Sequence, residues 1–183
     1  GLAEASVDGF GPAVLIPVRV AHAEALAVLS RLEESEAELS AALESPEHQV
    51  QALLVLGSVR RRRGDLRGAR EALVGALAAA SDRGDERRAA EALRALGLLD
   101  YFEGRFRDAE HHVEQARVLA EQVGDRRGVG WALQHLAWSA TTRGDYELAM
   151  EALRQAEEHF AALEDIGGLS WVAGTEGFVR LLQ

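Results

Sequence analysis

The amino-acid sequence predicts an all-α protein whose helices pair and stack into an α-α superhelix. The first observation behind this prediction is a step of forty residues, which joins Leu56, Leu96 and Leu136; Gly64, Gly104 and Gly144; Ala69, Ala109 and Ala149; and Ala76, Ala116 and Ala156. A fixed period of this kind is typical of arrays in which each unit packs on its neighbours. The second is the composition, which is 48% hydrophobic but only 5% aromatic, as suits closely packed helices rich in alanine. We expect about nine helices.

The array is expected to span residues 16–183, after a poorly ordered lead-in over residues 1–15 that holds three glycines and one proline. The first unit covers roughly residues 16–49. It matches the second unit at a step of 34, through Ser35, Leu39, Ala42 and Leu43, which correspond to Ala69, Leu73, Ala76 and Leu77. Further units cover roughly residues 50–89, 90–129 and 130–169, and a half unit covers residues 170–183.

Each full unit is expected to contain two helices. In the clearest copy the first helix runs over about residues 86–103 and stops at Gly104, because glycine readily adopts the left-handed conformation that ends a helix. The second helix runs over about residues 106–123 and carries small apolar residues on one side, at Ala109, Val113, Ala116 and Ala120.

The junctions between helix pairs carry aspartates that can cap the following helix, at Asp85, Asp125 and Asp165. Glycine precedes the aspartate at these junctions except at Glu164. The same short turn is therefore expected to recur along the array.

Composition also restricts the compartment and the class of partner. The net charge is −10 and all 20 basic residues are arginine, which disfavours nucleic acid and anionic membranes because both require a cationic surface. The chain has no cysteine, so it forms neither disulfides nor thiolate metal sites. It also lacks an apolar run of about eighteen residues and an evident signal peptide. We expect a cytoplasmic protein, and we interpret the chain, which begins at Gly1 rather than methionine, as a piece of a longer one.

The residues Leu56, Gly57, Gly64, Asp65, Ala69, Leu73 and Ala76 form a pattern that resembles the tetratricopeptide repeat. The step of forty with Gly-Asp junctions resembles a longer variant of that repeat. The stretch Leu-Leu-Asp-Tyr-Phe-Glu-Gly at residues 98–104 is similar to arrays in actinobacterial ATPase-linked transcription activators and nucleotide cyclases. The pattern departs from the family where Arg60, Asp100, Ala140 and Arg180 replace its usual tyrosine. The resemblance implies a right-handed solenoid with a concave groove.

The resemblance further implies that the side of each first helix opposite its core stripe lines that groove. All three tryptophans of the chain fall on this side, and arginines that can pair with a carboxylate lie toward its N-terminal end. An apolar ligand with an acidic group would fit both features. The candidate groove residues are Arg61, Arg62, Arg94, Tyr101, Phe102, Trp131, Gln134, Trp138, Trp171 and Phe178.

Structural alternatives stay open for several of these residues. Trp131 and Trp138 would instead wedge against neighbouring first helices and only stabilise the packing. The arginines at residues 60–63 would instead form a solvated helix end, where cations favour the helix dipole. The adjacent His111 and His112 have no third ligand at metal spacing, so we expect them at the surface and predict no metal site.

The sequence contains no Walker loop and no Gly-x-Ser-x-Gly stretch, so we predict neither an enzyme nor a cofactor. We interpret the chain as a protein- or peptide-binding scaffold or sensor module of a larger bacterial regulatory protein. Its partner would be a protein or peptide segment, or another domain of the same polypeptide. A small-molecule effector sensor in the same groove is one alternative. Self-association is another, as a homodimer through the C-terminal half unit, where Trp171, Val172, Phe178, Val179, Leu181 and Leu182 lack a covering partner.

Overall fold

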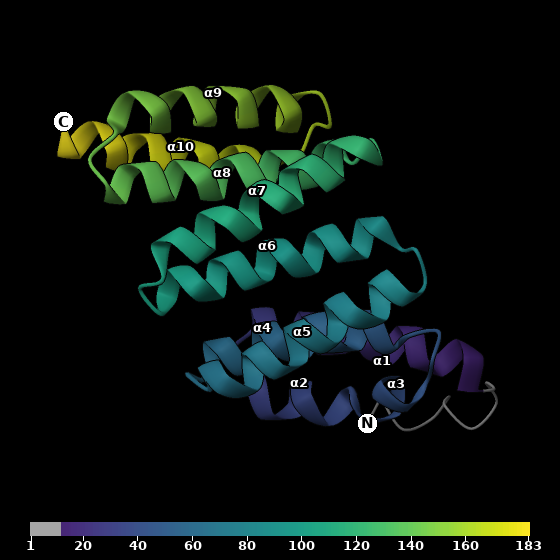
Figure 1. Cartoon of the computed structure of the whole chain (residues 1–183). Helices are drawn as coiled ribbons and strands as arrows, with labels where there is room; N and C mark the ends of the chain where they lie inside the picture. The colour runs from purple at the N-terminus through teal and green to yellow at the C-terminus, as the bar shows by residue number, and fades with distance from the viewer. Residues whose placement is uncertain (1–11) are drawn as a thin grey trace. The chain divides into compact units, whose positions relative to one another are not determined.

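The computed structural model describes residues 12–183, and every regular element in that range is an α-helix (Figure 1). The helices are α1 (Pro12–Val28), α2 (Leu32–Glu38), α3 (Ser40–Glu44), α4 (Gln49–Arg62), α5 (Leu66–Asp82), α6 (Glu86–Phe102), α7 (Phe106–Gln122), α8 (Arg126–Thr142), α9 (Tyr146–Ala161) and α10 (Ile166–Leu182). The all-α prediction is confirmed. Within the described range there is one helix more than the nine or so expected, because Leu39 divides the second helix of the first unit into α2 and α3.

The expected lead-in is partly helical. Helix α1 begins at Pro12, so residues 12–15 belong to it, and residues 1–11 lie outside the described residues. None of the helices in the described range is both long enough and apolar enough to cross a membrane.

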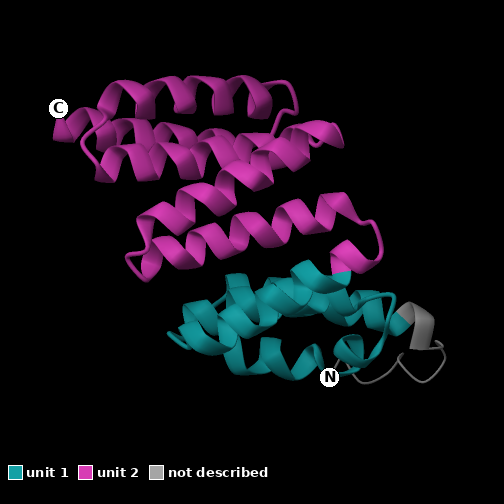
Figure 2. Ribbon diagram, viewed as in Figure 1, with its two compact units in different colours: residues 1–79 teal, residues 80–183 magenta. Residues whose placement is uncertain are grey.

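The chain divides into two compact units, residues 1–79 and residues 80–183 (Figure 2). In unit 1, α1 packs against α2, α3 and α4, and α4 packs in turn against α2 and α3. Its core includes Ala23, Leu39 and Val59, all fully buried. The Ser35 hydroxyl is also buried and donates a hydrogen bond of 2.7 Å to the Ala23 carbonyl oxygen, which joins α2 to α1.

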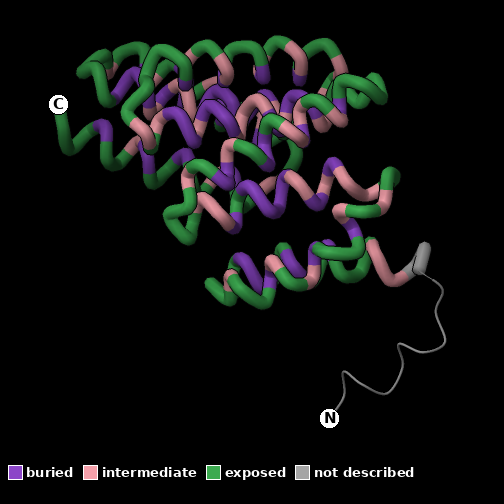
Figure 3. The backbone as a smooth tube through the Cα atoms, turned by 60° about the horizontal axis from the view of Figure 1, so that its bottom comes forward, coloured by how far each residue is buried: buried purple, intermediate pink, exposed green. Residues whose placement is uncertain are grey.

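Unit 2 is a regular stack of helix pairs. Each of α6, α7, α8 and α9 packs on the helix that follows it, and α6 also contacts α8 while α8 contacts α10. Helices α6, α8 and α10 therefore form one layer and α7 and α9 form the other. Along the helices, buried and exposed residues alternate, because one side of each helix faces its neighbours and the other faces solvent (Figure 3).

The junctions of unit 2 have the backbone that the sequence predicts. Gly84, Gly104, Gly124 and Gly144 have φ between 65° and 78°. The carboxylates of Asp85, Asp125 and Asp165 accept hydrogen bonds from backbone N–H groups three residues later, at 3.0 to 3.1 Å. The predicted caps are confirmed. Glu164 adopts the same left-handed backbone with φ 53°, although a β-carbon makes that conformation unfavourable.

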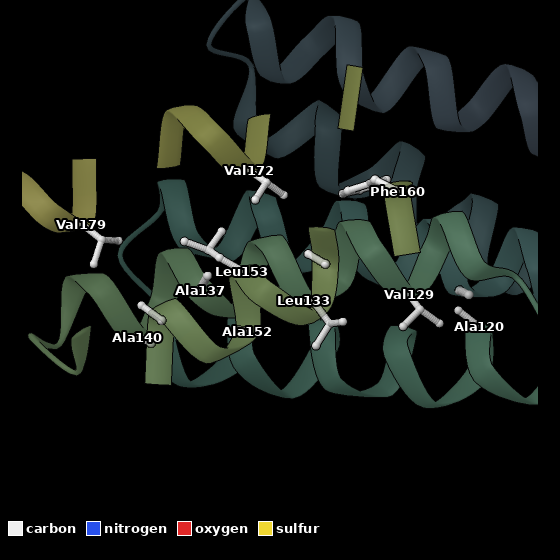
Figure 4. Packing of buried hydrophobic residues seen from close by; sticks show 13 residues of the cluster. Ala120, Val129, Leu133, Ala137, Ala140, Ala152, Leu153, Phe160, Val172 and Val179 are labelled. Carbon is white, nitrogen blue, oxygen red and sulfur yellow. The ribbon is translucent and has the colours of Figure 1, made fainter. Parts of the chain in front are cut away.

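The last full helix pair differs from the one before it at Phe160, near the end of α9. Its ring is fully buried and lies among Val129, Leu133 and Val172 of α8 and α10 (Figure 4). Room for the ring comes from two glycines: a Cβ at Gly130 would lie 2.9 Å from Phe160 Cζ, and a Cβ at Gly168 would overlap the ring. At the equivalent position forty residues earlier the chain has Ala120.

Candidate ligand-binding site

The centre of the candidate site is a row of three aromatic rings on the layer formed by α6, α8 and α10. We call Tyr101, Trp138 and Phe178 the aromatic row. The Tyr101 and Trp138 ring centroids are 6.1 Å apart with the rings edge to face, and those of Trp138 and Phe178 are 6.0 Å apart with the rings nearly stacked. Each first helix of unit 2 thus contributes one ring to a continuous apolar surface.

Hydrogen bonds fix two positions along this surface. The Tyr101 hydroxyl lies 2.8 Å from the Thr142 hydroxyl and so joins α6 to α8. Gln134 is buried, and its side-chain amide donates to the Thr175 hydroxyl of α10 at 3.3 Å. Gln134, predicted as a groove residue, is therefore buried between α8 and α10.

A hollow of about 380 Å³ opens at the C-terminal end of the row, and Trp138, Trp171 and Phe178 form its walls. Trp171 is 57% exposed, and Phe178 is also exposed. Gly174 lies between them on α10 and has no side chain to fill the space. Exposed apolar surfaces of this size are uncommon on soluble proteins, and they often mark binding sites.

Of the other two predicted aromatic residues, Phe102 adjoins the row, whereas Trp131 lies about two turns before Trp138 on α8. Phe102 is exposed and touches Tyr101 edge-on, with centroids 6.1 Å apart. Trp131 is half-buried and packs edge to face against Phe160, with centroids 5.1 Å apart. Phe160 lies on α9, a second helix, so this contact is not the packing against neighbouring first helices given as the alternative. Trp138 does contact both neighbouring first helices, through Tyr101 of α6 and Phe178 of α10.

The predicted arginines are divided between the two units. Arg61 and Arg62 belong to unit 1, where Arg61 is half-buried and the exposed Arg62 side chain donates a hydrogen bond to the Ala27 carbonyl oxygen. Arg94 belongs to α6 of unit 2 and is half-buried. It lines a second hollow, of about 470 Å³, between α6, α7 and α8. We call this space, with Arg87, Arg88, Arg94, Arg127 and Trp131 in its wall, the basic hollow.

Burial lowers the pKa of Arg94, because loss of hydration destabilises the charged guanidinium. The neighbouring Glu91 opposes this change by attraction. Sequence reasoning placed Arg94 in the site but did not identify the three arginines that share its hollow. These three share a position that the sequence could have revealed, in the first turn of a first helix: Arg87, Arg88 and Arg127.

A charged cluster formed by α6, α7 and the turn between them was not expected from the sequence. Asp100 is only 1% exposed, and its carboxylate accepts a hydrogen bond of 2.6 Å from Arg105. The second carboxylate oxygen lies 2.6 Å from His112 Nδ1. His112, expected at the surface, is therefore half-buried and bound to Asp100. The sequence does show that Asp100 replaces the usual tyrosine of the repeat pattern, but this pattern does not identify Arg105 and His112 as its partners.

Comparison with known proteins gives a match of part of the chain to a family model and a similarity in fold to a solved structure. Residues 102–162 match the family model for the tetratricopeptide repeat. Repeats of this family generally act as non-catalytic scaffolds for interactions between proteins. No curated protein sequence matches the chain.

Among solved structures, the chain is similar to BtubC (BKLC) from P. vanneervenii, with a TM-score of 0.62 and 15% sequence identity. The similarity covers 91% of this chain and 83% of that one. At this identity the similarity concerns the fold alone, and it agrees with an all-α superhelix.

Proposed function

We propose that the chain is a scaffold or sensor module that binds a segment of another protein, or of another domain of its own polypeptide, along the aromatic row. The observation that carries the proposal is the continuous apolar surface of Tyr101, Trp138 and Phe178 on three successive first helices. Large aromatic side chains on a rigid surface bury much area at little loss of conformational entropy, so they are frequent anchors in protein interfaces.

The match of residues 102–162 to the tetratricopeptide repeat supports this proposal, because proteins are the usual ligands of such repeats. The Gly-Asp junctions and the step of forty residues, which resemble the longer variant in actinobacterial activators and cyclases, support a place in a larger cytoplasmic regulatory protein. In such a protein the ligand would bias the activity of an attached effector domain.

A library of random twelve-residue peptides displayed on phage tests the proposal. Peptides enriched on the unmodified chain should bind at least tenfold more weakly to Trp138→Ala or Phe178→Ala. A suitable control is Val118→Ala, which removes an exposed apolar side chain from α7, outside the row. Helicity of each variant, measured by circular dichroism, must match that of the unmodified chain. Peptides that bind all four proteins equally would contradict the proposal.

Self-association is the second candidate, and the exposed face of α10 favours it. Leu181 is 81% exposed, and a Cβ added at Gly177 would meet no atom within 4 Å. A second α10 packed on this face would cover Leu181 and Phe178. The mass measured by light scattering should then be that of a dimer and should fall to that of a monomer in Leu181→Glu. A monomeric unmodified chain at all concentrations would exclude this candidate.

A small effector molecule in the hollow beside Trp171 is the remaining alternative. Its apolar walls and its volume of about 380 Å³ are within the usual range of small-molecule sites. A thermal-shift screen separates it from peptide binding, because a ligand that binds only the folded chain raises the melting temperature.

A further inference from the structure

The basic hollow contains more positive than negative charge, although the chain as a whole is acidic. Four arginines line it, against the two carboxylates of Glu91 and Asp125. The rest of the lining consists of three alanines of α6 and α7, Gly128 and Trp131, so that charged and apolar surfaces adjoin within one hollow.

Three of the four arginines are paired within the chain. Arg87 Nη1 lies 3.7 Å from Asp125 Oδ1, and Arg88 Nη1 lies 3.4 Å from Glu91 Oε2. Arg127 Nε donates a hydrogen bond of 2.7 Å to Asp165 Oδ2. Among residues 80–183, Arg94 forms neither a hydrogen bond nor an ion pair within 4.0 Å.

A half-buried guanidinium without a partner does not stabilise the chain that carries it. The charge loses part of its hydration, and the five N–H donors gain no acceptor in return. The lowered pKa of Arg94 reports the same imbalance. An uncharged side chain of similar length would fill this position at lower free energy, so the guanidinium itself requires an explanation.

We propose that the basic hollow binds a small carboxylic acid, with its carboxylate on Arg94 and a flat apolar body against Trp131. The planar guanidinium matches a carboxylate with two parallel hydrogen bonds. A volume of about 470 Å³ is suited to a small molecule. Glu91 and Asp125 in the wall repel a doubly charged phosphate more strongly than a carboxylate, which favours a monoanion.

This site is distinct from the aromatic row. Arg94 precedes Tyr101 by seven residues on α6, and Trp131 precedes Trp138 by seven residues on α8. Seven residues of helix correspond to about 10 Å, or two turns. A ligand in the basic hollow can therefore bind whether or not a peptide occupies the row, and the two proposals can be tested with different variants.

Phenylacetate and phenylacetamide are matched probes, because they share a phenyl ring and a side-chain length but differ in charge. Each is titrated into the 183-residue chain while the indole N–H signal of Trp131 is followed by NMR. Phenylacetate should shift this signal to saturation, and phenylacetamide should bind at least tenfold more weakly. Arg94→Gln should weaken phenylacetate binding by about ten- to hundredfold, since a hydrogen-bonded charge pair is lost.

Arg107→Gln is the matched control, because it removes one positive charge from an exposed position of α7 that does not line the hollow. It should change phenylacetate binding less than about twofold, since a distant exposed charge is screened. The melting temperature of Arg94→Gln should equal or exceed that of the unmodified chain. A loss of binding in this variant then cannot be due to unfolding. Arg94→Lys provides a second test, because it keeps the charge but should weaken binding through loss of the two-pronged contact.

Several results would overturn this inference. Equal binding of acid and amide, or an equal loss in Arg94→Gln and Arg107→Gln, would exclude a carboxylate contact at Arg94. Stronger competition by inorganic phosphate than by phenylacetate would exclude a monoanion site. If a capped Glu-Phe dipeptide binds and phenylacetate does not, the ligand of the basic hollow is an acidic side chain of a peptide, and a small-acid site is excluded. Trp138→Ala should leave phenylacetate binding unchanged, because Trp138 does not line the basic hollow. The two proposals can therefore fail independently of each other.

Discussion

Replacement of Phe160 by alanine should destabilise unit 2 strongly, even though Ala120 occupies the equivalent place one unit earlier. The ring is fully buried between Gly130 and Gly168, and neither glycine has a side chain that can fill the space it leaves. Removal of a buried phenylalanine side chain costs about 3–5 kcal/mol. With about 2–4 °C per kcal/mol for a chain of this size, the melting temperature should fall on the order of 10 °C.

A second substitution makes the test more specific. Gly168→Ala alone should destabilise by about 1–3 kcal/mol, because its Cβ would overlap the Phe160 ring. In the Phe160→Ala background the same methyl group enters vacated space and replaces a helical glycine, so it should be neutral or stabilising. The two changes should therefore be coupled by about 1–3 kcal/mol.

Urea unfolding followed by helicity and by tryptophan fluorescence measures all four proteins of this cycle. Trp131 should report the change directly, because its indole packs on the Phe160 ring. A loss below about 1 kcal/mol for Phe160→Ala would refute the account of the packing. Strict additivity of the two substitutions would refute the role given to Gly168.

Three further predictions concern the junctions and the buried charge. Glu164→Gly should raise stability by about 1 kcal/mol, because glycine adopts the left-handed backbone of this position without strain, whereas Glu164→Ala should change it little; thermal melting measures both. The pKa of Asp165 is lowered by hydrogen bonds from the Gly168 N–H and from Arg127, so its stabilising effect is present above its unfolded pKa of about 3.9 and is lost as the pH falls through the lower folded value. Melting temperatures between pH 6 and pH 2 should therefore fall less steeply in Asp165→Asn, and parallel curves would contradict the assignment. Asp100→Ala should cost about 1–3 kcal/mol in urea unfolding because two hydrogen-bonding partners lose their acceptor, while the exposed Asp108→Ala should cost within about 0.5 kcal/mol.

The fold could be predicted from the sequence because its signals are local and repeated. A glycine followed by an aspartate determines a helix end and the next helix start, and these residues recur at fixed spacing. The break at Leu39 could not be predicted, because residues around it keep the apolar spacing of one continuous helix.

The candidate site was predictable only in part. Helical spacing identifies which residues share a face, and it groups Trp138 with Phe178, whose rings stack across neighbouring first helices. It does not show how deeply a residue sits between two helices, so the burial of Gln134 against Thr175 was not foreseen. Nor does it show which charges pair. The pairing of Asp100 with His112 depends on where α6 crosses α7, and that crossing depends on the packing of the whole layer.

The close fit of Phe160 restricts how this array can lengthen. Because the junctions share one backbone path, a duplicated forty-residue segment placed after Asp165 would join without a change of turn. A duplicate of residues 126–165 would set Gly128 against the phenyl ring, as Gly168 is now. A duplicate of residues 86–125 would set Arg88 there instead, and the ring would have no room. A copy of the last full helix pair can therefore be inserted at this point, whereas a copy of the pair before it would clash with the Phe160 ring.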